Sequence, residues 1–290
     1  MRARLNRHHP TKGWLVALTA LFGSWDCAWA QSAAAPPGRV APTCDRSAFH
    51  LVLDVGHSDQ VPGAKTARGL REYDYNLRLA KLVDQQLVAA GFTSTKLLIT
   101  DGAKMKSLHH RVARANNASA DLFLSIHHDA VPDSFLQNWV YQGEPHKFSD
   151  RFKGHSIWVS QDNRDYSGSL LFGKLLGNEL KTRGLKYTTH YTEKFMGRYR
   201  WPLVDSEAGV YRHDALIVLK DTRMPAVLLE AGSIINRDEE LVMQSPEHQG
   251  LIAAAVTKAA DEFCTARGPN GSQRVARERG SAVATHAKQR

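Results

Sequence analysis

Three apolar runs of the chain each end on a side chain that can do acid–base or metal chemistry. Leu51–His57 and Asp121–His127 finish on histidine, and Pro225–Glu230 finishes on glutamate. Apolar runs of this length indicate buried β-strands. In open α/β sheets the ligand crevice lies outside the carboxyl ends of the strands. We therefore expect these three side chains to meet at one edge of a sheet, although more than 170 residues separate the first from the last.

Two imidazoles and a carboxylate predict a hydrolytic metal site. Catalytic zinc takes three nitrogen or oxygen ligands from the protein and keeps a fourth position for water. His57 and His127 supply two ligands, and Glu72, which opens a helix just past the glycine-rich loop 56–69, supplies the third. Glu230 closes an apolar strand, where an ionised carboxylate is costly unless it is paired or near a metal. We predict Zn²⁺ at the first three residues and a catalytic base at Glu230.

Neighbouring polar residues are candidates for supporting the ligands or contacting the substrate: His128, Asp129 and Asn76. Alternation along an extended chain points His128 away from His127. A lone histidine at a strand end is more often structural than a ligand, because histidine has many roles. The metal prediction therefore rests on the whole set of residues and on no single one.

The elements that must position these side chains follow an α/β order. Helical spacing begins at Glu72 and stops at Gly91, and the strand, helix, strand sequence then runs on to His127. Further strands are expected at 96–99, 156–159, 216–219 and 226–229, helices at 170–180 and 251–263, and a short helix capped by residues 236–240. The order predicts one domain, residues 46–264, with a sheet between helices. Residues 131–154 and 186–213 show no clear period, and the first of these is a candidate lid inserted after His127.

The two ends of the chain differ from this body in composition and charge. A basic head, an apolar stretch and Ala28-Trp29-Ala30 predict a secretory signal peptide over residues 1–30, followed by an Ala/Pro-rich linker to residue 45. Residues 1–30 carry a net charge of +3 and residues 265–290 of +5, so only +1 of the total +9 is left for the body. That balance gives no electrostatic case for nucleic acid. The basic tail 265–290 is expected to be disordered, or to contact anionic envelope polymers or lipid headgroups.

Two cysteines remain after the predicted signal peptide. Cys44 precedes the first strand and Cys264 ends the last helix. In an oxidising compartment they can join the two ends of the domain, and the sequence leaves this open against a pair of buried free thiols.

Five segments of the body together resemble the zinc-dependent N-acetylmuramoyl-L-alanine amidases of the amidase 3 type. They are LVLDVGHS, Gly63-Ala64, REYDYNLRLA, DLFLSIHHDA and MPAVLLEAGSIINRDEE, and they span residues 51–263. The resemblance implies a mixed, mostly parallel sheet of about six strands between helices. It implies zinc at His57, Glu72 and His127, with Glu230 as the catalytic carboxylate. It also implies a periplasmic or secreted enzyme that acts on peptidoglycan or muropeptides.

Three positions depart from the family's pattern and put fine specificity in doubt. The usual Ala-Asn after S-I-H is His128-Asp129, the aromatic residue after E-x-G is Ser233, and the usual T-R pair is Thr100-Asp101. We find no helical insertion of the kind that blocks zinc in relatives regulated at division, so the need for a protein activator stays open. Two other readings compete with the amidase. One is a zinc carboxypeptidase or aminopeptidase, and the other is a wall-binding protein without catalysis.

Overall fold

The computed structural model describes residues 43–102 and 104–268. The predicted signal peptide, most of the linker and the tail from residue 269 lie outside the described residues. Helix α6 (Pro246–Arg267) continues three residues past the point where the sequence analysis placed the start of the tail. None of the helices in the described ranges has the length and apolar character that crossing a bilayer needs.

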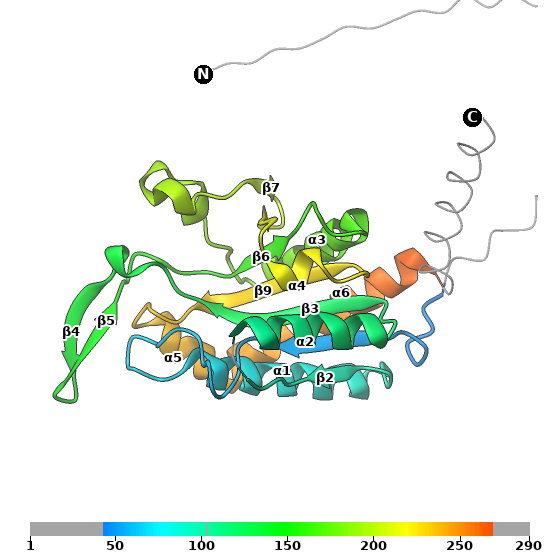
Figure 1. Cartoon of the computed structure of the whole chain (residues 1–290), viewed down its shortest axis with the longest axis horizontal. Coiled ribbons are helices and arrows are strands. Elements are labelled where there is room, and N and C mark those ends of the chain that lie inside the picture. Colours follow the sequence, from blue (N-terminus) through cyan, green and yellow to red (C-terminus); the bar gives the residue numbers. More distant parts are fainter. Residues whose placement is uncertain (1–42, 103, 269–290) are drawn as a thin grey trace, which may run out of the picture. The chain divides into compact units, whose positions relative to one another are not determined.

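A seven-stranded sheet forms the centre of the described chain (Figure 1). Its strands are β1 (Leu51–Val55), β2 (Lys96–Leu98), β3 (Leu122–Asp129), β6 (Ser156–Val159), β7 (Leu203–Asp205), β8 (Val210–Arg212) and β9 (Ala226–Ser233). The order is β2-β1-β3-β9-β6-β8-β7, in which β2, β1, β3 and β9 are parallel and β6 runs antiparallel to β9. This confirms the mixed, mostly parallel sheet, with seven strands where about six were expected.

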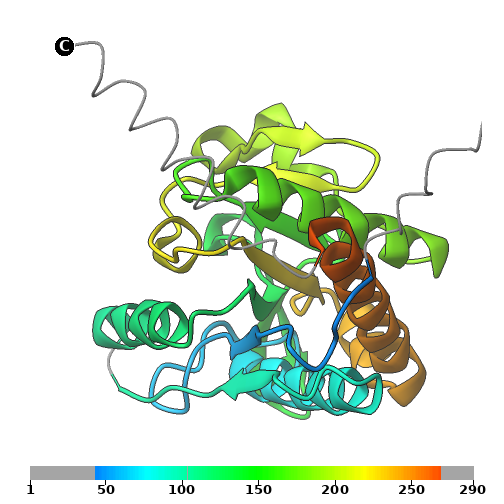
Figure 2. The ribbon, with the colours of Figure 1, turned by 90° about the vertical axis from the view of Figure 1, so that its right-hand side faces the viewer.

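Helices cover both faces of this sheet (Figure 2). On one face, α1 (Glu72–Ala89), α3 (Tyr166–Thr182) and α6 pack on the alternate strand residues that include Leu51 and Leu53. On the other face, α2 (Lys104–Asn117) and α4 (Ile217–Lys220) pack on the residues between them, such as Val52. The period of two along each strand thus divides the core into two layers. A short helix, α5 (Glu239–Gln244), follows β9.

Two expectations for the regular elements were wrong. The apolar run 216–219 forms helix α4 and not a strand, because so short a run fits either structure and its packing against α2 decides. Residues 186–213 hold two short 3₁₀ helices, η2 (His190–Thr192) and η3 (Lys194–Tyr199), and then the strands β7 and β8.

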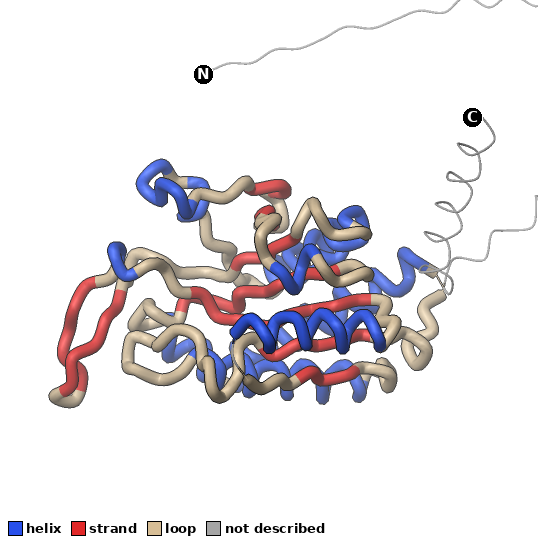
Figure 3. The backbone as a smooth tube through the Cα atoms, in the orientation of Figure 1, coloured by secondary structure: helices blue, strands red, loops and turns tan. Residues whose placement is uncertain are grey.

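The segment 131–154 is also more regular than its sequence suggested. After η1 (Asp133–Phe135) it forms a hairpin of β4 (Gln137–Tyr141) and β5 (Glu144–Phe148) that projects beyond the sheet (Figure 3). The indole of Trp139 anchors this hairpin by donating to the carbonyl of Ala67 at 2.9 Å. The guanidinium groups of Arg68 and Arg237 lie 5.6 and 5.2 Å from the Trp139 ring centre. These contacts hold the hairpin against the glycine-rich loop and against the segment between β9 and α5.

A disulfide joins Cys44 to Cys264, whose Cα atoms are 5.2 Å apart. It ties the segment before β1 to the last turns of α6. The structure therefore favours the bonded alternative over two free thiols.

Candidate metal centre

The predicted site residues lie where the central strands end. His127 of β3 stands directly opposite Glu230 of β9 in the parallel register, so their side chains project from the same face of the sheet. His57 follows the end of β1, the other neighbour of β3. Glu72 comes from a different direction, as the first residue of α1. The sheet order thus brings together residues that are far apart in sequence.

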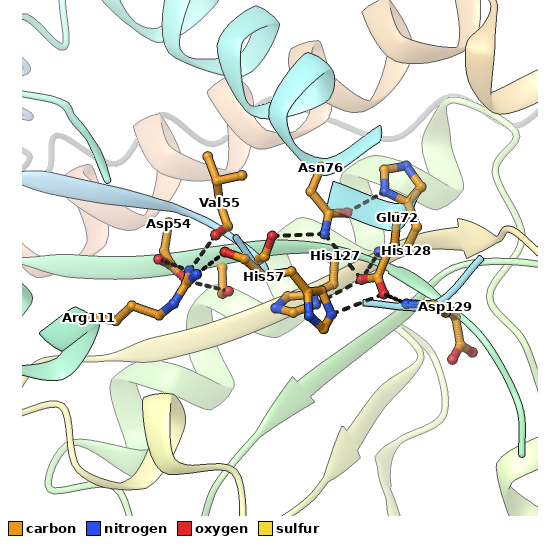
Figure 4. A network of polar contacts seen from close by, with 12 residues as sticks. Asp54, Val55, His57, Glu72, Asn76, Arg111, His127, His128 and Asp129 are labelled. Atoms are coloured by element: carbon orange, nitrogen blue, oxygen red, sulfur yellow. Dashed lines mark hydrogen bonds and ion pairs between the residues drawn. The ribbon is translucent and has the colours of Figure 1, made fainter. Parts of the chain in front are cut away.

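Three of these side chains converge on one point (Figure 4). His57 Nε2 lies 3.0 Å from Glu72 Oε2, and His127 Nδ1 lies 3.1 Å from Glu72 Oε1. One donor atom from each of the three residues falls within 4.8 Å of the others, which is close enough to share a metal ion. The Glu72 side chain is only 5% exposed, whereas the His57 and His127 side chains are 26% and 17% exposed. The centre is therefore open to solvent on its histidine side.

Two glycines make this convergence possible. A Cβ on Gly56 would lie 2.4 Å from the ring of His127, and one on Gly63 would lie 2.3 Å from Glu72 Oε2. Gly63 also has a φ of 79°, which glycine adopts readily. The loop they belong to turns back so that the Ala64 N–H donates to Glu72 Oε2 at 3.0 Å.

The Glu72 carboxylate is kept ionised by its neighbours. Burial alone would raise its pKa, but hydrogen bonds from His127 and His57 outweigh burial and hold that pKa well below its usual range. The Asn76 amide, one turn along α1, donates to Glu72 Oε1 at 3.1 Å and to the Gly56 carbonyl at 3.2 Å. An ionised carboxylate and two imidazoles form a donor set that suits a divalent metal ion.

The two adjacent histidines of β3 have different surroundings. The His128 ring packs edge-on against Tyr75 of α1, and its Nδ1 is 2.7 Å from Asn76 Oδ1. Burial lowers the pKa of His128 to about 3, so this imidazole is neutral and contacts Asn76. Asn76 therefore connects His128 to Glu72 and to the loop that carries His57.

The Glu230 carboxyl group has the opposite surroundings. Its Oε2 atom is buried and has no hydrogen-bond partner among the described residues. Burial raises its pKa well above the usual value, and the negative charges of Asp129 and Glu72 raise it further. A carboxyl group with a raised pKa, next to a set of residues that could hold a metal ion, can act as a proton acceptor and donor.

Asp129 lies close enough to affect Glu230, and it has its own partner. The Tyr191 hydroxyl lies 2.7 and 2.8 Å from the two carboxyl oxygens of Asp129. Burial raises the pKa of Asp129 to about 7, against the lowering effect of the Tyr191 hydrogen bond. The sequence analysis named Asp129 but not Tyr191, which lies 62 residues further along the chain.

The sequence also did not predict the buried polar cluster of Asp54, Arg111 and Ser125 close to His57. Arg111 of α2 donates from Nη1 to Asp54 Oδ1 at 2.6 Å, and the Ser125 hydroxyl donates to Asp54 Oδ2 at 2.7 Å. The signal was present in the sequence, because a carboxylate inside the apolar run of β1 needs a partner. The sequence did not show which of the many arginines would supply it.

Two hollows flank the centre. One lies against α2 and α4, and its lining includes His57, Arg111 and His127. The other is an open groove of about 630 Å³ between the glycine-rich loop and the β4–β5 hairpin, and its lining includes Lys65, Ala130, Asp133 and His146.

Comparison with known proteins decides the family. A family model described as N-acetylmuramoyl-L-alanine amidase matches residues 51–262, which include every element of the centre. The chain belongs to this family. The matched range runs from the first residue of β1 into α6, so the amidase domain covers the sheet and the helices on both of its faces.

Curated relatives are amidases that the chain matches only in part. It is 42% identical over 84 residues to the N-acetylmuramoyl-L-alanine amidase LytC of Bacillus subtilis, a match that covers 29% of the chain and 16% of LytC. It is 27% identical over 208 residues to the probable cell wall amidase LytH of Staphylococcus aureus, which covers 71% of the chain and 55% of LytH. The chain thus spans about half the length of LytH and much less of LytC.

Solved structures of amidases share the fold. The N-acetylmuramoyl-L-alanine amidase of Clostridium difficile 630 superposes with a TM-score of 0.56 at 20% identity, over 77% of this chain and all of that one. The amidase Ami1 of Mycobacterium smegmatis gives 0.57 at 19% identity, over 76% of this chain and 98% of that one. At this level of identity the likeness establishes the architecture and leaves the chemistry to the site.

Proposed function

We propose that the chain is a secreted zinc amidase that hydrolyses the amide between N-acetylmuramic acid and L-alanine in peptidoglycan. One observation carries the proposal: His57, Glu72 and His127 converge where Glu230 stands opposite His127 in the sheet, and Oε2 of Glu230 is buried with no hydrogen-bond partner in the part of the chain that the structure describes. Membership of the amidase family supports the choice of bond. The name of LytH, a probable cell wall amidase, supports a place in the cell envelope.

The donor set fits zinc. Three nitrogen or oxygen ligands from the protein are typical of catalytic zinc, whereas structural zinc sites are closed by a fourth protein ligand. Zinc bound there would polarise the amide carbonyl and make an attacking water acidic enough to react near neutral pH. Glu72 stays ionised and is fixed by Asn76, so the ligands are arranged before the metal arrives.

Glu230 has the proton-transfer role in this proposal. Its carboxylate accepts a proton from the attacking water as the new C–O bond forms. The same carboxyl group then gives that proton to the amine nitrogen of L-alanine as the C–N bond breaks. The raised pKa of Glu230 suits both steps, because a group with a usual glutamate pKa would hold the proton too weakly.

The test is digestion of purified peptidoglycan, with mass spectrometry of the released products. The mature protein is compared with and without a chelator, and after zinc is restored. Free stem peptides that begin with L-alanine, lost with the chelator and regained with zinc, are the expected result. Single amino acids released while the peptides stay on the glycan would instead indicate a zinc exopeptidase. No cleavage in spite of bound zinc would indicate that an activator is needed.

A further inference from the structure

Arg111 lies beside the candidate metal centre and donates to the backbone carbonyl of one predicted ligand, His57. It belongs to α2, is only 2% exposed, and extends toward the carboxyl end of β1. Its guanidinium forms an ion pair with Asp54 and also donates to two backbone carbonyls, those of Val55 and His57 (Figure 4). The second of these carbonyls belongs to a proposed metal ligand.

The carbonyls at the end of β1 are held from both sides of the sheet. Those of Val55 and His57 accept from Arg111, and the one between them, of Gly56, accepts from Asn76 at 3.2 Å. Arg111 reaches them from α2 and Asn76 from α1, helices that pack on opposite faces. Three consecutive carbonyls thus receive side-chain hydrogen bonds at the point where the ladder between β1 and β3 stops.

The backbone at this point needs such support. His57 has a φ of 67°, a left-handed conformation that is unfavourable for a residue with a Cβ. This conformation turns the His57 imidazole toward Glu72 and not onward along the strand. A strained conformation persists only where its surroundings determine it, and here the surroundings include the two side-chain donors as well as the backbone bond from Gly56 N–H to the Ile126 carbonyl at 2.9 Å.

We propose that Arg111 is a positioning residue that fixes the backbone of His57 and so sets the metal affinity of the centre. The inference rests on the proposed metal site. Arginine suits this role because its planar fork donates in several fixed directions, whereas lysine offers a single flexible point. Asp54, held in turn by Ser125, balances the buried charge and orients the fork.

The experiment measures Zn²⁺ affinity of the metal-free mature protein by competition with a chromophoric chelator. Arg111→Met should raise the Kd by about 10–100-fold, the usual effect of losing a group that orients a ligand. Arg111→Lys should lie between this variant and the wild type. Arg114→Met is the matched control, because Arg114 is exposed on the same helix, and it should leave the Kd unchanged.

A second readout separates positioning from simple structural support. The absorption spectrum of bound Co²⁺ reports ligand geometry, and it should change in Arg111→Met and not in Arg114→Met. Urea unfolding of the metal-free variants measures their stability independently. A variant that is less stable but keeps the wild-type Kd and Co²⁺ spectrum would overturn the inference.

The remaining outcomes are also decisive. If Arg111→Met does not fold, Arg111→Lys is compared with the wild type, and an unchanged Kd and spectrum in that variant would overturn the inference. If the wild type itself binds no Zn²⁺, both the proposed function and the role of Arg111 are rejected. Wild-type binding together with equal binding by both Arg111 variants would reject the positioning role and leave the amidase proposal intact.

Discussion

The proposed ligand side and the proposed base side of the centre differ in how their polar atoms are satisfied. On the ligand side, the two oxygens of Glu72 accept hydrogen bonds from Asn76 and from the Ala64 N–H in addition to the two histidine contacts. On the base side, Oε2 of Glu230 is buried without a partner among the described residues. These two carboxyl groups share one site, yet their pKa values are shifted in opposite directions.

The difference separates two tasks. A group that holds a metal must stay ionised and stay in place, and a dense set of donors achieves both. A group that moves a proton must bind it strongly enough to keep it and must not be locked by other bonds. If this division is correct, substitutions on the ligand side will change metal affinity, and substitutions on the base side will change turnover without changing metal affinity.

His57→Ala should have the largest effect. It removes one of three proposed ligands and exposes Glu72 to water in its place, so both zinc binding and amidase activity should be lost. The measurement is metal content by mass spectrometry together with peptidoglycan digestion. His50→Ala is the control, because His50 is exposed just before β1 and outside the centre. Zinc bound at the wild-type level would remove His57 from the ligand set.

Glu230→Gln should have the next largest effect on turnover and none on binding. Loss of proton transfer should lower activity by about 10²–10⁴-fold while zinc affinity stays unchanged. The exposed Glu193→Gln is the control for the same chemical change. Full turnover by Glu230→Gln would contradict the role of the base, and loss of zinc would break the comparison between the two sides.

Glu230→Gln should also change the stability of the metal-free protein, and it should increase that stability at neutral pH. The pKa of Glu230 is higher in the folded protein than in the unfolded chain, so its ionisation above the unfolded value opposes folding. Glutamine cannot ionise, and the metal-free variant should therefore be more stable than the wild type at neutral pH and not in acid. Urea unfolding at two pH values, with chelator present, measures this difference.

Sequence reasoning found the side chains of the centre because the strand pattern shows where each strand ends. It did not find Tyr191 or Arg111, because each acts through a contact to an element distant in the chain. Periodicity along one segment carries no information about which helix lies beneath which strand. The roles given to the site residues stay predictions until the variants are measured.

In the fold, too, local sequence patterns were predictive and contacts between distant segments were not. The parallel strands β1, β3 and β9 were placed correctly, because each is a continuous apolar run between clear turn signals. The β4–β5 hairpin and helix α4 were not. The hairpin is stabilised by contacts of Trp139 with arginines from two other segments of the chain, and α4 is too short for its period to be recognised. Whether the hairpin closes over a substrate stays a prediction.

Asn76→Ala should have an intermediate effect and sharpen the comparison. It removes the donor to Glu72 and Gly56 and leaves the His128 ring without its partner. Zinc affinity should fall by about 10–100-fold, and stability by about 1–3 kcal/mol, since buried groups lose their partners. Asn178→Ala on the exposed face of α3 is the control. An unchanged zinc affinity would mean that Glu72 needs no support.

Removing the disulfide should have the smallest effect on the centre and yet a large one on the fold. Cys44 and Cys264 are 220 residues apart in sequence, so their bond restricts the unfolded chain strongly, and the double serine variant should lose about 2–4 kcal/mol. Cys44 lies before the start of β1, whereas His57 lies past its end, and the strand between them is held on both sides by β2 and β3. Zinc affinity of the folded variant should therefore equal that of the wild type. A weaker affinity would show that the arrangement of the ligands depends on the stability of the whole domain and not on the local hydrogen bonds.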